Sequence, residues 1–205
     1  EDVFVFACFN QQIKITPKIF ESWIRILSAI PNSVLWLAEA NSIQVSNLKS
    51  YANSRGIDQC RLVFAERVPY ERHLGRYAFA DLVLDTFPFN GGTTTSDALW
   101  GGAPVVTMTG DSYSSRMSAS LLHSVGLDEL ITQNLSDYET LAIKLASESE
   151  YLGSLRNRLK SALGTAPAFN TKRFVKHLEI GLRMAMDRHN NKLNPESLFV
   201  PLFDC

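Results

Sequence analysis

Residues 82–100 decide the fold, and they read LVLDTFPFNGGTTTSDALW. The apolar run Leu82–Leu84 predicts a buried strand, and Ala98–Trp100 predicts the first turns of a helix. The loop between them carries adjacent glycines and three consecutive threonines, which suits the presentation of backbone N–H groups and hydroxyls at a positive helix end. The segment therefore indicates a phosphate site, with a capped helix after a flexible turn as the alternative.

The composition is that of a folded, nearly neutral protein. Hydrophobic residues make up 45% of the chain and charged residues 20%, as in globular proteins. The length of 205 residues is enough for one domain or two small ones. The 20 basic and 21 acidic residues give a net charge of −1, so we expect neither nucleic acid nor an acidic membrane as a partner. No apolar run approaches the ~20 residues that span a bilayer, and the acidic start predicts no signal peptide.

Three cysteines, Cys8, Cys60 and Cys205, form no metal-binding pattern. Their odd and sparse number predicts a reducing, cytoplasmic environment in which Cys8 and Cys60 are buried packing residues. The abrupt apolar start suggests a fragment from the C-terminal half of a longer protein.

Apolar runs and helix signals alternate along the chain. Strands are predicted at 3–9, 33–38, 61–65, 82–84 and 104–108. Helices are predicted at 17–30, 43–55, 69–76, after the glycine–threonine loop, and at 113–125, 135–148, 150–163 and 171–189. This alternation predicts an α/β fold, a Rossmann-like and mainly parallel sheet with helices on both faces. Ligands of such sheets bind beyond the strands' carboxyl ends, where the loops 10–14, 67–73 and 87–97 should line one rim.

The common catalytic motifs are absent. The sequence has no P-loop, no GxGxxG after its first strand, no GxSxG, no HExxH and no paired-cysteine metal site. What remains is the phosphate-type loop with Lys14, His73, Asp97 and Arg116. A cation, a helix amino end, an aromatic plane and a carboxylate are what metal-free recognition of a nucleoside diphosphate needs.

Five segments also resemble a known family. They are Phe9-Asn10-Gln11-x-x-Lys14-Ile15, Val34-Leu35-Trp36-Leu37, Leu84 to Trp100, Pro104-Val105-Val106-Thr107-Met108 and Phe169-Asn170-Thr171-Lys172. Over residues 3 to 185 the chain is similar to the C-terminal donor-binding half of the catalytic region of O-GlcNAc transferases, glycosyltransferase family 41, in a bacterial-type member. The resemblance implies the C-terminal lobe of a GT-B glycosyltransferase, with a nucleotide-sugar-binding lobe at 1–189 and a tail at 190–205.

The resemblance implies a role for each matching position. Lys14 would be catalytic, contacting the donor diphosphate and stabilising the leaving UDP. Asp97 would bind the ribose hydroxyls, and His73 would stack on the uracil. The other residues implied to bind the nucleotide sugar are Gln11, the main chain at Val68, and Gly91, Gly92, Thr93 and Thr94 in the phosphate loop.

Some positions depart from the family pattern. Gly92 stands where animal members carry a histidine, and Tyr70 replaces a lysine near the nucleotide. The Phe87–Phe89 segment and the triple threonine are more similar to the SPINDLY-type protein fucosyltransferases, which use GDP-fucose. Asp97 before Ala98-Leu99-Trp100, and the segment Ser115–Met117, match the UDP-sugar members better, so UDP-GlcNAc is the favoured donor.

The implied reaction is an inverting, metal-independent transfer of GlcNAc from UDP-GlcNAc to protein Ser/Thr hydroxyls. The acceptor lobe and the tetratricopeptide repeats of the family precede this segment, and no general base is evident, so the chain alone is expected to bind UDP weakly and transfer nothing. The alternatives are a GDP-fucose-using enzyme, a non-catalytic nucleotide-binding module and a two-lobed epimerase, the last disfavoured by a lack of acidic pairs in the loops.

The remaining conspicuous residues are expected to be structural. The three tryptophans, Trp23, Trp36 and Trp100, fall on apolar faces and are predicted to be core. The apolar rows in 151–163 and 174–186 are predicted to pack, and His123, His177 and His189 are assigned no chemical role. Arg116 could be an exposed helix residue, a partner for Asp111 or a residue of the site, and the sequence does not favour the site over the other two.

Overall fold

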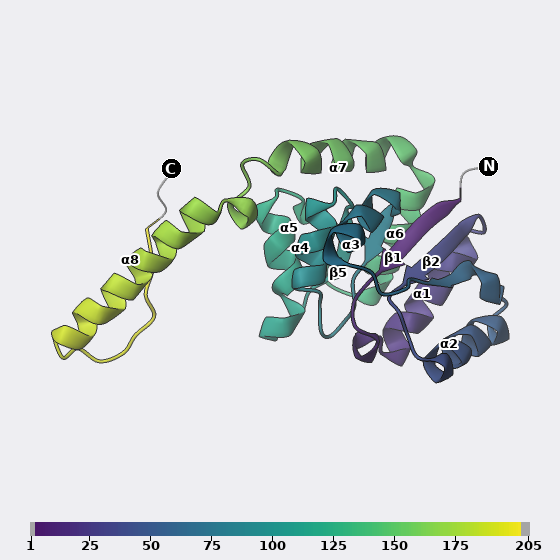
Figure 1. Cartoon of the computed structure of the whole chain (residues 1–205), viewed down its shortest axis with the longest axis horizontal. Coiled ribbons are helices and arrows are strands. Elements are labelled where there is room, and N and C mark those ends of the chain that lie inside the picture. Colours follow the sequence, from purple (N-terminus) through teal and green to yellow (C-terminus); the bar gives the residue numbers. More distant parts are fainter. Residues whose placement is uncertain (1–2, 202–205) are drawn as a thin grey trace.

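The computed structural model describes residues 3–201 and contains one six-stranded sheet (Figure 1). All recorded strand pairs are parallel, and the order across the sheet is β3-β2-β1-β4-β5-β6. The strands are β1 (Phe4–Cys8), β2 (Ser33–Leu37), β3 (Leu62–Phe64), β4 (Leu82–Leu84), β5 (Val105–Met108) and β6 (Ile131–Thr132). The predicted Rossmann-like α/β fold is confirmed.

Helices cover both faces of the sheet (Figure 1). Helices α1 and α6 pack together against one face, α3, α4 and α5 lie on the other, and α7 packs on α6. The helices are α1 (Pro17–Ala29), α2 (Ser42–Ser54), α3 (Tyr70–Arg76), α4 (Thr93–Trp100), α5 (Met117–Ser124), α6 (Leu135–Ser147), α7 (Ser149–Ala162) and α8 (Thr171–Asn190).

The predicted helix ends follow from local chemistry. Thr16 caps α1 by accepting a hydrogen bond from the Ile19 amide, and proline follows at the first helical position. Gly56, just beyond the end of α2, has a φ of +80°, which favours glycine over any residue with a Cβ. These ends confirm the sequence-based boundaries to within one or two residues.

The strand order reverses between β1 and β4. From β1 the chain goes to β2 on one side and later returns to β4 on the other, so the loops after β1 and β4 leave neighbouring carboxyl ends. Two buried hydrogen bonds hold the residue that follows β4. The Trp23 indole N–H donates to the Tyr138 hydroxyl, which donates to the Asp85 carbonyl, each over 3.0 Å. The predicted binding rim is therefore at a topological switch point.

The structure corrects one predicted helix and adds one strand. Residues 113–125 form a 3₁₀ turn, Tyr113–Ser115, and then α5, because Arg116 breaks the helical path with φ −117° and ψ −2°. The turn is held away from a continuous helix by the Asn90 amide, which donates to the Ser114 carbonyl over 3.0 Å. Strand β6 was not predicted, and its two residues are too few to show a periodicity.

Two burial predictions for single residues were wrong. Trp100 is 54% exposed, because it ends α4 at the surface, where its ring packs against that of Phe169 with centroids 5.3 Å apart. Cys60 is exposed in the 3₁₀ turn that precedes β3, whereas Cys8 is buried. Burial raises the pKa of the Cys8 thiol to about 12. Cys205 lies outside the described residues.

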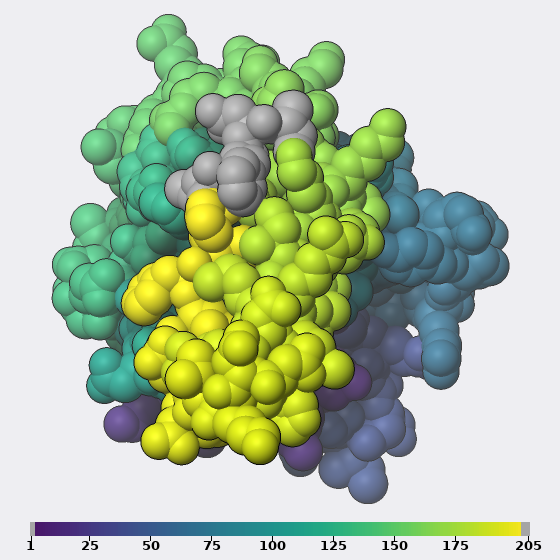
Figure 2. Space-filling view, turned by 90° about the vertical axis from the view of Figure 1, so that its left-hand side faces the viewer, coloured from purple at the N-terminus to yellow at the C-terminus, as the bar shows by residue number. Residues whose placement is uncertain are grey.

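Helix α8 extends away from the rest of the molecule (Figure 1), and Figure 2 views the protein from that end. None of its residues is buried, and its apolar row is 49–62% exposed. The prediction that this row packs is therefore wrong within this chain. The row consists of Phe174, Leu178, Leu182 and Met186. The segment 193–201 has no regular secondary structure, and no helix among residues 3–201 is both long and apolar enough to cross a membrane.

Candidate functional site

Asn10 fastens the loop after β1 to the loop after β4. Its side-chain amide donates to Asp85 Oδ1 over 3.0 Å and to Thr86 Oγ1 over 2.9 Å. Its carbonyl oxygen accepts a hydrogen bond from the Thr94 hydroxyl. Asn10 is only 4% exposed, so one buried side chain joins the ends of β1 and β4 to the start of α4.

Asp85 shapes the loop from inside. Besides Asn10, its buried carboxylate accepts hydrogen bonds from the Gly91 amide over 2.7 Å and from the Thr107 hydroxyl over 2.7 Å. A Cβ on Gly91 would lie 2.4 Å from Thr95 Oγ1, so only glycine fits there. Burial raises the pKa of the Asp85 carboxyl, and its hydrogen bonds oppose that rise. Gly91, predicted to contact substrate, thus has its amide N–H committed to the protein.

The amino end of α4 is open beyond this loop. Gly92 precedes the helix with no side-chain cap, and a Cβ there would lie 2.6 Å from the Met117 methyl carbon. Within residues 3–201, the backbone N–H groups of Thr93 and Thr94 donate to no protein acceptor. Unpaired N–H groups at a helix start form an anion site when an anion is available.

Lys14 lies against the same loop. Its ammonium donates to the Asn90 carbonyl over 2.9 Å and lies 4.2 Å from the centroid of the Phe89 ring. No carboxylate among the described residues comes within 4.0 Å of this ammonium. Partial burial lowers the pKa of Lys14, and the nearby Asp85 charge opposes that shift. The result is a cation that has no partner carboxylate and is fixed on Asn90, the residue immediately before the two loop glycines.

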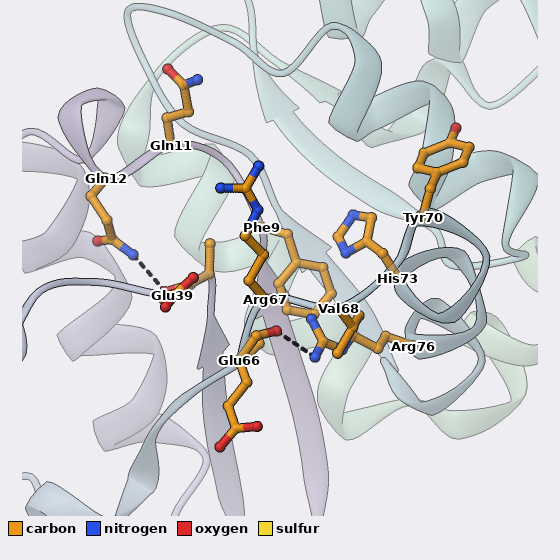
Figure 3. Close-up of a pocket in the computed structure, with 12 residues that line it drawn as sticks. Phe9, Gln11, Gln12, Glu39, Glu66, Arg67, Val68, Tyr70, His73 and Arg76 are labelled. Atoms are coloured by element: carbon orange, nitrogen blue, oxygen red, sulfur yellow. Dashed lines mark hydrogen bonds between the residues drawn. The ribbon is translucent and has the colours of Figure 1, made fainter.

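A cavity of about 560 Å³ brings together three of the predicted residues, Gln11, Val68 and His73 (Figure 3). His73 rises from α3, and its ring lies edge-on to Phe9 with centroids 5.4 Å apart. Burial lowers the pKa of His73, and the Asp97 charge opposes that shift. The neutral imidazole is the form that burial favours, and its plane is suited to stacking.

A second cavity, of about 710 Å³, brings together Gly92, Thr93 and Asp97. The Tyr70 hydroxyl donates to Asp97 Oδ1 over 2.8 Å, and this hydrogen bond raises the pKa of Tyr70. Tyr70 lines both cavities, so they adjoin at this residue. Arg116 is exposed and also lines the second cavity. Lys14, Gly91 and Thr94 line neither cavity: Lys14 lies in the loop after β1, Gly91 in the loop after β4 and Thr94 in the first turn of α4.

Arg67 and Arg76 are not among the site residues predicted from the sequence. Both line the first cavity, and Arg76 donates to the Glu66 carbonyl over 2.5 Å (Figure 3). Arg76 follows His73 by three residues, and that spacing on a helix places two side chains on one face, which is the signal that could have found it. No group of three or more His, Cys, Asp or Glu residues that could hold a metal ion occurs within 3–201.

Comparison with known proteins matches residues 1–178 to the family model for glycosyl transferase family 41. The chain belongs to glycosyltransferase family 41. It is similar to the probable UDP-N-acetylglucosamine–peptide N-acetylglucosaminyltransferase SEC of Arabidopsis thaliana, with 37% identity over 180 residues, covering 87% of this chain and 18% of SEC. The similarly named SPINDLY protein of the same plant is 35% identical over 183 residues, covering 87% of this chain and 20% of SPINDLY.

A similar solved structure agrees with the assignment of this chain to family 41. The O-GlcNAc transferase of Thermobaculum terrenum, crystallised as a mutant, superposes with a TM-score of 0.85 at 31% identity, covering 93% of this chain and 37% of that one. The fold is therefore that of the Rossmann-like lobe of a GT-B glycosyltransferase. The chain spans about a fifth of the length of the two plant relatives, and it contains the family's C-terminal part.

Proposed function

We propose that this chain is the donor-binding lobe of an inverting, metal-independent protein O-glycosyltransferase that transfers GlcNAc from UDP-GlcNAc to Ser/Thr hydroxyls. One observation carries the proposal: the Lys14 ammonium is fixed on the Asn90 carbonyl, beside the open amino end of α4 and without a carboxylate within 4.0 Å among residues 3–201. A cation and a helix amino end at one point suit a diphosphate. The names of the family relatives support the choice of donor.

In the proposed reaction, the acceptor oxygen attacks the anomeric carbon of the sugar. The bond from that carbon to the β-phosphate oxygen breaks, and its electron pair leaves with UDP. Negative charge develops on the β-phosphate, where Lys14 and the N–H groups of Thr93 and Thr94 would stabilise it. We expect the group that takes the proton from the acceptor hydroxyl to lie outside this chain.

The nucleoside would occupy the space around Tyr70. His73 would stack on the uracil and the Val68 main chain would contact its edge, since both line the first cavity. Asp97, in the second cavity, would exchange its hydrogen bond with Tyr70 for the ribose hydroxyls. Gln11 and Gly92 would then lie near the sugar and the phosphates.

GDP-fucose is the second candidate donor. It is favoured by the Phe87–Phe89 segment and by the triple threonine Thr93–Thr95. The identities to SEC and SPINDLY, 37% and 35%, are too close to separate the two donors. The base pocket therefore has to be tested directly.

Calorimetry of this chain with UDP and GDP tests the proposal. We expect UDP to bind more tightly than GDP, and Lys14→Ala to weaken UDP binding about 10–100-fold through the lost charge-assisted contact. Lys18→Ala, which removes an exposed lysine four residues away, is the matched control and should leave binding unchanged. Tighter binding of GDP would favour the fucosyltransferase alternative, and equal binding by Lys14→Ala would contradict the assignment of the site.

Transfer should be measured in the longer parent protein. There Lys14→Ala is expected to lower kcat about 10²–10³-fold, since one electrostatic contact to the developing charge is removed. The isolated chain should transfer nothing. A parent that binds UDP but does not transfer from UDP-GlcNAc or GDP-fucose would instead be a non-catalytic nucleotide-binding module.

A further inference from the structure

We infer that Phe89 is a positioning residue for Lys14: the face of its ring holds the ammonium against the phosphate loop and so sets where the cation meets the donor diphosphate. The inference rests on the proposed function for the role of Lys14. The contact itself rests on the geometry of the loop alone.

The first support is the closeness of the contact. The Lys14 ammonium lies 4.2 Å from the Phe89 ring centroid, the shortest cation–ring distance within residues 3–201. The other such contacts lie between 5.2 and 6.0 Å. A cation over the face of an aromatic ring is attracted by the negative face of the ring, most strongly where water is partly excluded.

The second support is that the ring and the hydrogen-bond acceptor are adjacent in sequence. Lys14 donates to the carbonyl of Asn90, and the ring belongs to Phe89. Both contacts therefore tie the cation to the one segment that leads into Gly91 and α4. A lysine side chain is long and mobile, so two contacts to one segment fix the position of its charge relative to the loop.

The third support is that Phe89 has little structural reason to be aromatic. Its side chain is 49% exposed at the rim, and it is not among the buried residues of the core or those packed against them. The framework of the loop comes instead from Asp85, Asn10 and Thr86, whose hydrogen bonds do not involve the Phe89 ring. Thr86 contacts only the Phe89 carbonyl, which any residue would supply.

The test is a double-mutant cycle on the 205-residue chain, measured by calorimetry with UDP and with uridine. Phe89→Leu keeps an apolar side chain but removes the ring. It should weaken UDP binding about 3–10-fold and leave uridine binding unchanged, because uridine has no phosphate for Lys14 to contact. Phe89→Tyr should retain wild-type UDP affinity. In a Lys14→Ala background, Phe89→Leu should have no further effect.

The control is Phe79→Leu, which removes an aromatic ring that is 73% exposed and lies over no cation within residues 3–201. It should change neither affinity. Equal weakening of UDP and uridine by Phe89→Leu, no weakening of either, or an undiminished effect in the Lys14→Ala background would overturn the inference.

A second readout separates this inference from the proposed function. Nuclear magnetic resonance of the Lys14 side chain in the free protein should show ε-protons shifted upfield by the ring in wild type and Phe89→Tyr. In Phe89→Leu this upfield shift should be lost, and the pKa of Lys14 should be lower. If no variant binds UDP, the proposed function fails, and this titration still decides whether the ring holds the cation. An unchanged Lys14 pKa and chemical shift in Phe89→Leu would refute the positioning role.

Discussion

The loop after β4 and helix α8 reverse the usual relation between polarity and burial. The loop is rich in polar residues, yet Asp85, Thr86 and Asn90 are at most 2% exposed. Helix α8 carries an apolar row at regular spacing, yet Leu178 and Leu182 are 49% and 62% exposed. Neither segment would be placed correctly by hydrophobicity alone.

The difference shows what each kind of burial requires. Polar groups can be buried in the loop because nearly every one is paired, from the Asp85 carboxylate to the Gly91 amide. An apolar row needs only a surface to cover it, and the described part of this chain leaves the row on α8 49–62% exposed. The loop is thus complete within the chain, and the following predictions test that contrast.

The largest effect is expected from Asp85→Ala. It leaves buried donors of Gly91, Asn10 and Thr107 without an acceptor, and each unsatisfied group costs about 1–3 kcal/mol. We therefore expect the free energy of unfolding in urea to fall by about 3 kcal/mol or more, with UDP binding lost as the loop loosens. Asp111→Ala removes an exposed carboxylate and should change stability little. A stability close to wild type for Asp85→Ala would mean that the loop is not held from inside.

A smaller loss is expected from Tyr138→Phe, which tests the support beneath the loop. Removing one hydroxyl unpairs both the Trp23 indole N–H and the Asp85 carbonyl, so the free energy of unfolding should fall by about 1–3 kcal/mol. Adding Trp23→Phe to Tyr138→Phe should cost less than Trp23→Phe alone, since the hydrogen bond is already gone. Strict additivity of the two changes would contradict a linked chain. Tyr113→Phe, at a side chain 78% exposed, is the control.

Much of the fold follows from local sequence. Buried parallel strands need continuous apolar runs, and helix ends need particular residues, so Leu82–Leu84, Thr16-Pro17 and Gly56 could be interpreted without knowledge of the rest. Other features depend on partners distant in sequence. The break at Arg116 depends on the hydrogen bond from the Asn90 backbone amide to the Ser114 carbonyl. The exposure of α8 depends on whether another segment packs on it, and none of its residues is buried.

The candidate site divides in the same way. Strand ends and loop composition predict that Lys14, His73 and Asp97 share a rim, because parallel strands end at one edge. Composition cannot show that the Gly91 amide is committed to Asp85, or that Tyr70 donates to Asp97. Such pairings depend on side-chain positions a few ångströms apart, set by the packing of α3 and α4.

A still smaller effect on stability is expected at His73. Its ring is partly buried, between the buried polar side chains of the loop after β4 and the exposed row of α8. Burial lowers its pKa below the ordinary value of 6.5, so folding favours the neutral ring. That contribution to stability is present above pH 6.5 and is lost as the pH falls through the folded-state pKa. Solvent screening should keep it below about 1 kcal/mol.

The measurement is a pair of unfolding curves across this pH range for wild type and His73→Gln. The wild type should lose stability relative to His73→Gln as the solution is acidified. His189→Gln, at an exposed position on α8, should follow wild type. Nuclear magnetic resonance titration of the His73 ring gives the pKa directly, and a value above 6.5 would reverse the sign of the prediction.

The smallest effect is expected on α8. Leu178→Ala removes an apolar side chain that is already 49% exposed, and alanine is the better helix former, so the free energy of unfolding of this chain should change by less than about 0.5 kcal/mol. Leu155→Ala in α7 is the matched comparison, since Leu155 is 0% exposed and its truncation should cost about 2–5 kcal/mol. A loss at Leu178 approaching that at Leu155 would show that α8 is covered in solution, for example by a second copy of the chain. Repeating the measurement at several protein concentrations separates the two explanations, because only cover by another molecule makes the loss depend on concentration.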